Sequence, residues 1–199
     1  KAFTVMEAMS PMAVNHDDPI RTCMAFTQTV QHQMITKRSM PNLVTTGADE
    51  ALPYLTSNKF AYKFAGKSGV VVEVTDDYII TQDTVTKEYD YVDLRELIQK
   101  NSDGGFYVTT KLSSIVKKGD KLHENQIVAY DKRCYSGAIG QKDNKEALSY
   151  NIGTLAKVAV MDTDLGYEDS CVIDNTISEA LATEFVVQKE INLDRNSNV

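Results

Sequence analysis

The sequence lacks the features of membrane-spanning, secreted and disulfide-rich proteins. It has no run of about 18 apolar residues, which a transmembrane helix needs, and no charged segment leading into a signal-peptide core. Its three cysteines are scattered at positions 23, 134 and 171, so neither a disulfide framework nor a CxxC metal site is indicated. We expect buried, inert thiols in a soluble intracellular protein.

Basic residues are also fewer than acidic ones. Lys and Arg total 21 against 28 Asp and Glu, a net charge of -7. Because phosphate neutralisation supplies most nucleic-acid affinity, this balance argues against a self-sufficient DNA-binding domain. Phosphate loops of the GxxxxGK[ST] type and G-x-S-x-G elbows are absent. The chain begins with Lys1 rather than Met, so we expect it to be a piece of a longer protein.

What is present is ordinary globular composition, 42% hydrophobic, patterned mainly as short strands. A helix is predicted from Pro19, with Asp18 as its cap. Strands over 69–74 and 78–81 form a predicted hairpin around Asp76-Asp77. Further strands are predicted over 89–92, 106–109, 126–130, 155–161 and 171–173, with a turn over 116–122 and a loop over 137–146. The capping box Thr176-Ile177-Ser178-Glu179 predicts a last helix reaching 187.

Two polar clusters are candidate sites. The first, His16-Asp17-Asp18-Pro19-Ile20-Arg21, is locally typical of a capped helix N-terminus. The second follows the predicted strand over 155–161 and runs from Asp162 to Ser170. Clustered oxygens suit Mg²⁺, but carboxylates in a turn are more often simply solvated. Asp162-Thr163-Asp164 also fits the short DxD pattern of a metal-dependent transferase, and a structural β-rich scaffold or virion protein is a further alternative.

Six segments in a fixed order carry a family resemblance. They are His16-Asp17-Asp18 with Arg21, Met24 and Gln31-His32-Gln33; Thr45-Thr46-Gly47-Ala48-Asp49-Glu50; Ser68-Gly69-Val70-Val71-Val72; Gly119-Asp120-Lys121-Leu122; Tyr150-Asn151 with Lys157-Val158-Ala159-Val160-Met161; and Gly166-Tyr167-Glu168-Asp169-Ser170. Together they resemble the second-largest (β) subunit of multisubunit DNA-dependent RNA polymerases. The motifs depart from the cellular pattern in spacing and sequence. In this respect the chain resembles the divergent polymerases of giant bacteriophages, whose subunits are split among several genes.

The resemblance implies a fold and a division of the chain. Residues 1–45 would be a helical segment leading into the barrel, and 46–110 an inserted small β domain. Residues 111–199 would begin the double-psi β-barrel (hybrid-binding) region of the β subunit. The expected fold class is therefore mainly β with a few short helices.

The resemblance also implies site residues for RNA synthesis on a DNA template. Arg21 would reach the triphosphate of the incoming nucleotide, a task suited to a forked guanidinium. Glu168 and Asp169 would match the acidic pair near the substrate phosphates, with Asp169 near a second Mg²⁺. His16, Asp17, Asp18 and Gln31 would support them.

The catalytic aspartates are expected on another chain. The partners implied are β′-like largest-subunit chains, which hold most of the Mg²⁺, and the remaining β-like chain, together with template DNA, nascent RNA and nucleoside triphosphates. No membrane is implied, and the location would be a bacterial host cytoplasm or a virion. The spacing after Arg21 is about two residues longer than the family pattern, so either Gln28 or Gln31 aligns with the family's polar contact.

Overall fold

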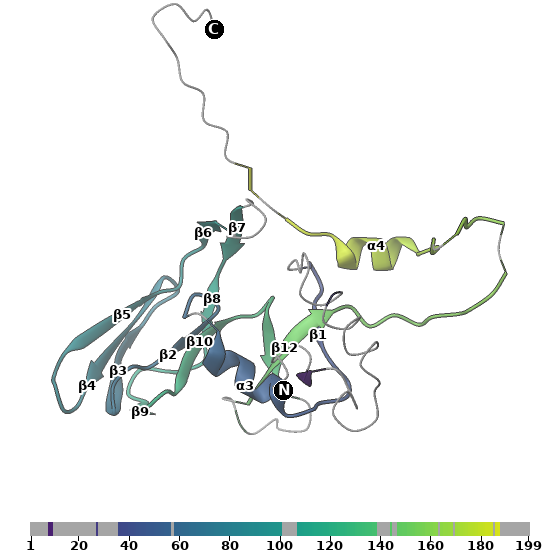
Figure 1. The fold of residues 1–199 in the computed structure, drawn as a ribbon. Coiled ribbons are helices and arrows are strands. Elements are labelled where there is room, and N and C mark those ends of the chain that lie inside the picture. Colours follow the sequence, from purple (N-terminus) through teal and green to yellow (C-terminus); the bar gives the residue numbers. More distant parts are fainter. Residues whose placement is uncertain are drawn as a thin grey trace, which may run out of the picture.

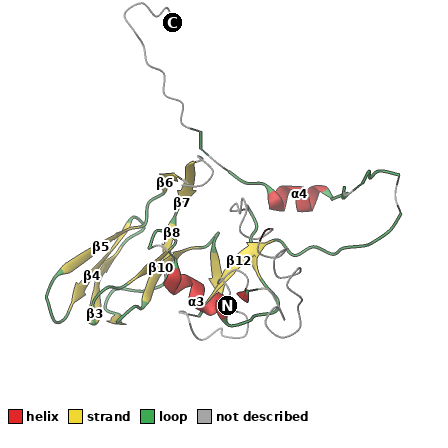
Figure 2. Ribbon diagram, in the orientation of Figure 1, coloured by secondary structure: helices red, strands yellow, loops and turns green. Residues whose placement is uncertain are grey.

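The computed structural model describes residues 8–9, 27, 36–56, 58–100, 107–138, 144, 147–162, 164–168, 170–184 and 186–187. These residues form a mainly β fold, as predicted, with open sheets and two short helices (Figures 1 and 2). The strands are β1 (Met40–Pro41), β2 (Ala61–Lys63), β3 (Ser68–Val74), β4 (Tyr78–Asp83), β5 (Tyr89–Asp93), β6 (Leu97–Lys100), β7 (Tyr107–Thr110), β8 (Leu112–Ser114), β9 (Lys121–His123), β10 (Ile127–Asp131), β11 (Tyr135–Gly137) and β12 (Leu148–Gly153). The helices are α3 (Ala48–Leu55) and α4 (Asn175–Leu181).

The strands form four antiparallel sheets. Their orders are β5-β4-β3-β9, β2-β10-β8, β1-β12-β11 and β6-β7. The predicted hairpin is confirmed as β3 and β4, because β-branched residues alternate between a buried and a solvent-facing side. The strands predicted over 89–92 and 126–130 are confirmed as β5 and β10, each shifted by at most one residue.

Strand β10 contributes to two hydrophobic cores. Val128 and Ala129 belong to the core formed with β3, β4, β5 and β9, which includes Val71, Ile79 and Val92. Ile127 belongs to a second core with helix α3 and strands β11 and β12. Four of the five β10 residues are fully buried, which places this strand at the centre of the described fold.

A close approach explains the glycine that begins the valine-rich strand. A Cβ on Gly69 would overlap the Phe64 ring and lie 3.0 Å from the Gln82 carbonyl oxygen. Phe64 is itself in the first core, with 3% of its surface exposed. The absence of a Cβ at Gly69 therefore lets the Phe64 ring approach the backbone of β3 closely.

Three predicted elements near the end of the chain are wrong in part or in whole. Residues 155–161 and 171–173 form no strand, because no neighbouring strand among the described residues supplies backbone partners. The last helix begins at Asn175, where Asp174 accepts a bond from the Ile177 amide at 2.8 Å. The cap is thus two residues before the predicted Thr176, and the helix ends at Leu181 rather than reaching 187.

Several other predictions fall partly outside the described residues. The helix from Pro19 lies outside them except for Thr27, which is helical, and most of the predicted loop over 137–146 lies outside them too. The division into 1–45, 46–110 and 111–199 stays a prediction. Strands β2 and β3 of the middle segment pair with β10 and β9 of the last one.

Candidate functional site

Most residues of the predicted site lie outside the described part of the chain. These are His16, Asp17, Asp18, Arg21, Gln31 and Asp169, together with the alternative Gln28. The structure does describe Glu168 and the motif segments 45–50, 68–72, 119–122, 150–151 and 157–161.

Glu168 lies in a tight, solvent-exposed turn. The Tyr167 amide donates to Ser170 Oγ at 2.6 Å, and the Ser170 amide donates to the Tyr167 carbonyl at 3.2 Å. Glu168 has φ 52°, a left-handed conformation that costs a residue with a Cβ about 1–2 kcal/mol. The turn directs the backbone so that the Glu168 carboxylate stays in solvent, accessible to a cation or a partner side chain.

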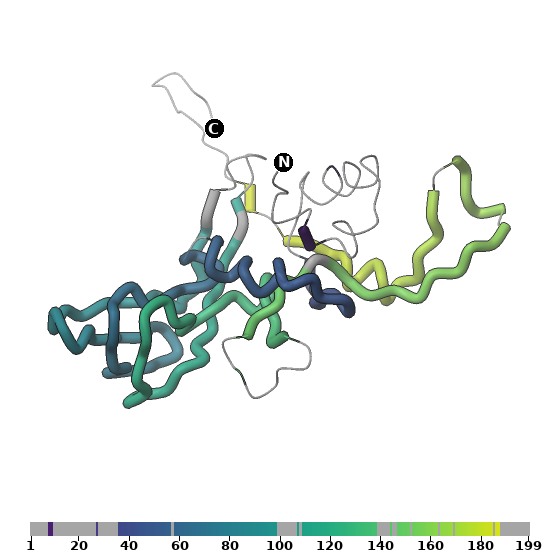
Figure 3. Tube along the Cα trace, turned by 60° about the horizontal axis from the view of Figure 1, so that its bottom comes forward, coloured from purple at the N-terminus to yellow at the C-terminus, as the bar shows by residue number. Residues whose placement is uncertain are grey.

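This turn is the tip of a segment that we call the arm, which consists of the described residues 155–162, 164–168 and 170–173. Figures 1 and 3 show the arm extending from the end of β12, well clear of the sheets, and returning at α4. The base of the arm is closed on residues 37–38. Thr154 Oγ1 donates to the Arg38 carbonyl at 2.7 Å, and the Lys37 and Arg38 amides donate to the Ala182 and Ala180 carbonyls at 2.8 and 3.1 Å.

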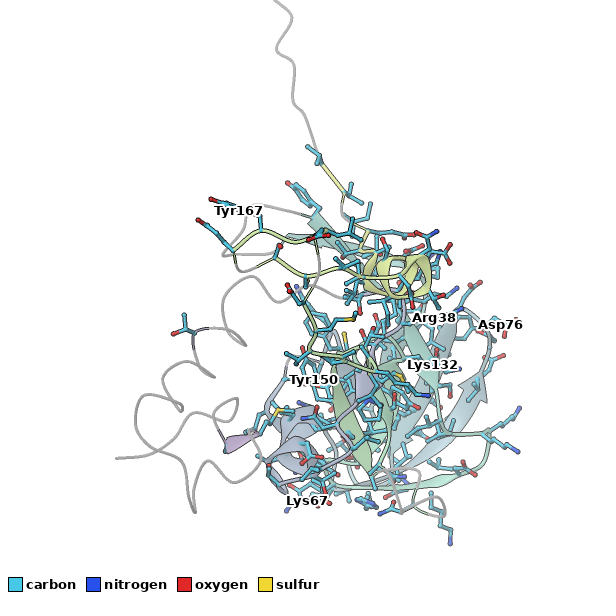
Figure 4. The ribbon with its side chains drawn as sticks, turned by 90° about the vertical axis from the view of Figure 1, so that its right-hand side faces the viewer. Arg38, Lys67, Asp76, Lys132, Tyr150 and Tyr167 are labelled. Atoms are coloured by element: carbon cyan, nitrogen blue, oxygen red, sulfur yellow. The ribbon has the colours of Figure 1, made fainter. Side chains whose placement is uncertain are left out.

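The arm carries apolar side chains in full contact with solvent. The exposed fractions are 84% for Val158, 100% for Val160 and 83% for Tyr167. Figure 4 shows Tyr167 on this segment, well apart from Tyr150 of β12. A contiguous apolar segment of this kind is typical of an interaction surface. The sequence predicted the apolar run but placed it in a strand.

Two motif segments that lie about 100 residues apart meet at the start of α3. Asp49 is 3% exposed, and its Oδ1 accepts bonds from the Thr46 and Gly47 amides at 3.3 and 3.1 Å. Its Oδ2 accepts a bond from Ser149 Oγ at 3.2 Å, on β12 directly before Tyr150-Asn151. The acidic residue of the Gly47 motif thus satisfies the amides that precede α3 and joins them to β12.

Asn151 continues this polar seam. The side-chain Oδ1 of Asn151 accepts a bond from Ser136 Oγ at 2.8 Å, and its side-chain Nδ2 donates to the Lys132 and Arg133 main-chain carbonyls at 3.4 Å each. Asn151 is 5% exposed. Its role in this structure is to hold the turn between β10 and β11.

A second pair of motifs meets between β3 and β9. Gly69 and Val70 pair with Leu122 and Lys121 across the two strands. The Gly119 amide donates to the Val71 carbonyl at 2.8 Å, and the Val71 amide donates to the Asp120 carbonyl at 2.9 Å. The φ of 89° at Gly119 permits this tight turn, so the Gly-Asp turn is bound directly to the valine strand.

One buried ion pair was not found by sequence reasoning. Asp131 Oδ2 and the Arg133 guanidinium are 2.8 Å apart, and the Asp131 side chain is 1% exposed. The pair lies beside a shallow hollow of about 240 Å³ lined by Glu96, Lys111, Ser113, Asp131, Lys132 and Arg133. Arg133 also donates to the Thr109 carbonyl and hydroxyl at 2.6 and 3.1 Å. Its guanidinium is therefore engaged in holding β7 to β10.

The cysteines behave differently from one another. Cys134 is buried, as predicted, and desolvation raises the pKa of its thiol to about 12, so it is not a thiolate near neutral pH. Cys171 is exposed on the arm, which corrects the expectation of burial for this residue. Cys23 lies outside the described residues.

Asp162 and Asp164, the candidate DxD carboxylates, are both exposed on the arm. Within the described residues, no group of three or more His, Cys, Asp or Glu side chains is arranged to hold a metal ion.

No helix in the same residues is long and apolar enough to cross a membrane. Comparison with family models finds none that matches the chain, and no curated protein matches it either.

Proposed function

We propose that this chain is part of the β-like subunit of a multisubunit DNA-dependent RNA polymerase. The observation that supports this best is the pairing of the motif segments. Segment 45–50 is bound through Asp49 to Ser149, the residue directly before segment 150–151, and segments 68–72 and 119–122 are joined by strand pairing and two further backbone bonds. Segments that resemble one family in their order thus lie beside one another in this fold, which supports the proposal.

The arm supports the second part of the proposal, that the chain completes a double-psi barrel with other chains. Both remaining described motifs, 157–161 and 166–170, are on the arm, whose apolar side chains are exposed. Burying Val158 and Val160 against a partner would contribute about 1.5–3 kcal/mol each. The partners are a β′-like chain and the remaining β-like chain, together with DNA, RNA and nucleoside triphosphates.

The chemistry assigned to this chain is positioning and charge neutralisation. Arg21 would pair with the triphosphate, and Glu168 and Asp169 would face the substrate side and a second Mg²⁺ held mainly by the partner. His16, Asp17, Asp18 and Gln31 would support Arg21. When bound, Mg²⁺ supplies charge neutralisation on the transferring phosphates. A host cytoplasm or virion is the corresponding location.

The test is reconstitution of the enzyme with its other subunits. We expect Arg21→Ala and Asp169→Ala to lower kcat/KM for nucleotide addition by about tenfold or more, because one preorganised charge contact is lost. Glu168→Gln tests the described carboxylate, and Glu179→Gln, on exposed α4, is its matched control. Asp164→Asn separates the transferase alternative, since only that alternative requires the DxD pair.

Two outcomes would refute different parts of the proposal. If the chain does not copurify with a subunit carrying the catalytic aspartates, the function itself is wrong. If it assembles but the Arg21 and Asp169 variants add nucleotides as the unmodified enzyme does, the site assignment is wrong.

A further inference from the structure

The solvent-facing side of the β3-β4-β5 sheet is unusually rich in tyrosine. Cross-strand pairs share a face, and the register pairs Tyr78 with Asp93, Ile80 with Tyr91 and Gln82 with Tyr89. Glu73 of β3 pairs with Ile80 and so adds a carboxylate to the same side. The alternate residues Ile79 and Val92 are at most 1% exposed in the first core. The tyrosines therefore face away from that core.

Two of these tyrosines, the partly buried Tyr78 and the exposed Tyr91, form a stacked pair on this face. The Tyr78 and Tyr91 ring centroids are 5.5 Å apart at an interplanar angle of 29°. Tyr91 is 54% exposed and Tyr89 is 66% exposed. Tyrosine offers a large, rigid contact area at low entropic cost, which is why exposed groups of it mark binding surfaces. We call Tyr78, Tyr89 and Tyr91 the tyrosine platform.

Carboxylates surround one end of the platform. The pKa of the Tyr78 hydroxyl is raised chiefly by the charge of Glu73, then by burial and a side-chain hydrogen bond to Glu73, with a smaller contribution from Asp77. Asp76 is exposed in the same turn. The guanidinium at this end, Arg95, is bound by both oxygens of Asp93 at 3.0 and 2.7 Å. The local field is therefore negative, and an aromatic face adds to the attraction for a cation.

The sheet edge beside the platform is open. Strand β5 is terminal in the order β5-β4-β3-β9, and within the described residues no strand pairs with its outer side. An extended peptide can bind such an edge and place alternate side chains over the adjacent face. Figure 1 shows this sheet at the end of the molecule opposite the arm.

We propose that the tyrosine platform binds an extended, arginine- or lysine-bearing segment of a partner protein. One cationic side chain stacks on the Tyr78–Tyr91 pair and is neutralised by Glu73 and Asp77, while the backbone of the segment runs along β5. A nucleic acid does not fit here, because its phosphates would meet the same carboxylates. This inference does not rest on the proposed polymerase function.

The test uses the full chain and a fluorescein-labelled peptide of alternating arginine and threonine, measured by anisotropy at low salt. Tyr91→Ala is expected to weaken binding by about threefold to tenfold, the range of a cation–π contact at a partly exposed site. Tyr91→Phe, which keeps the aromatic ring, is expected to bind the peptide as the unmodified chain does. Tyr54→Ala, a tyrosine of α3 that is 45% exposed, is the matched control and leaves binding unchanged.

The charge contribution has its own variant pair. Glu73→Gln weakens peptide binding, whereas Glu124→Gln, in the exposed turn before β10, removes the same charge without effect. Circular dichroism and urea midpoints confirm that each variant is folded. Equal losses in the Tyr91 and Tyr54 variants would overturn the proposal, and so would tighter binding of a single-stranded oligonucleotide than of the peptide.

Discussion

The chain holds two Asp-x-Arg pairs that differ chiefly in burial, and this predicts very different effects on stability. In both, the arginine main-chain amide and Nε donate to one carboxylate oxygen and an Nη donates to the other. The Asp131 side chain is 1% exposed and that of Arg133 33%, whereas those of Asp93 and Arg95 are 23% and 62% exposed. We predict that Asp131→Ala destabilises the fold far more than Asp93→Ala.

The magnitude follows from the groups left behind. Asp131→Ala removes the acceptor of the Lys111 amide, 3.0 Å from Oδ2, and of the Arg133 amide, 2.9 Å from Oδ1. It also leaves a partly buried guanidinium without its counterion. Breaking a buried pair in this way costs about 3–5 kcal/mol. We expect about 3 kcal/mol, the lower end, because Arg133 keeps Thr109 as a partner and is one third exposed.

The assay is equilibrium urea unfolding followed by far-ultraviolet circular dichroism. The exposed pair is screened by water and salt, so Asp93→Ala is expected to lose no more than about a third of the free energy that Asp131→Ala loses. Similar losses in the two variants would show that pair geometry rather than burial sets the energy. A loss below about 1 kcal/mol for Asp131→Ala would refute the reasoning directly.

Three further predictions concern packing, reactivity and pH. Gly69→Ala is expected to cost about 1–3 kcal/mol in urea unfolding, because its Cβ overlaps a core ring. Gly137→Ala, where a Cβ would meet nothing within 4 Å, is the control and should be nearly neutral. In a variant that lacks Cys23, Cys171 should react with a maleimide within minutes, whereas Cys134 should react only on unfolding. The Cys134 thiol is buried and its pKa is raised to about 12. Equal reaction rates for the two thiols would contradict this prediction. The guanidinium partner holds the pKa of Asp93 at about 2, so its stabilising pair is fully present above about pH 4 and is lost as the pH falls through 2. Carboxyl-carbon NMR measures this titration midpoint, and a substitution that removes the Arg95 guanidinium should return the pKa of Asp93 toward its ordinary value of 3.8.

Local patterns were sufficient for part of the fold. The hairpin of β3 and β4 follows from β-branched alternation on both sides of the Asp76-Asp77 turn. The Gly-Asp turn follows from the left-handed backbone that Gly119 adopts. In these places a short stretch contains both the strands and the turn that joins them, so the pattern needs no distant partner.

Strands β11 and β12 could not be predicted in this way. Ser149 and Asn151 are buried on β12, where an alternating pattern would call for apolar side chains. They are tolerated because Asp49 and Ser136, distant in sequence, satisfy their polar atoms. Nothing near positions 149 and 151 indicates these partners.

The same distinction between local pattern and distant partners applies to the candidate site. The sequence by itself determined the mainly β class, the local turns and the order of motifs that resemble a polymerase subunit, because these depend on neighbouring residues. Only the tertiary structure decided that the motifs meet in pairs and that residues 155–161 leave the sheets to form an exposed arm. An apolar run carries a preference for burial, but whether a partner strand is present to bury it depends on the rest of the fold and on other chains.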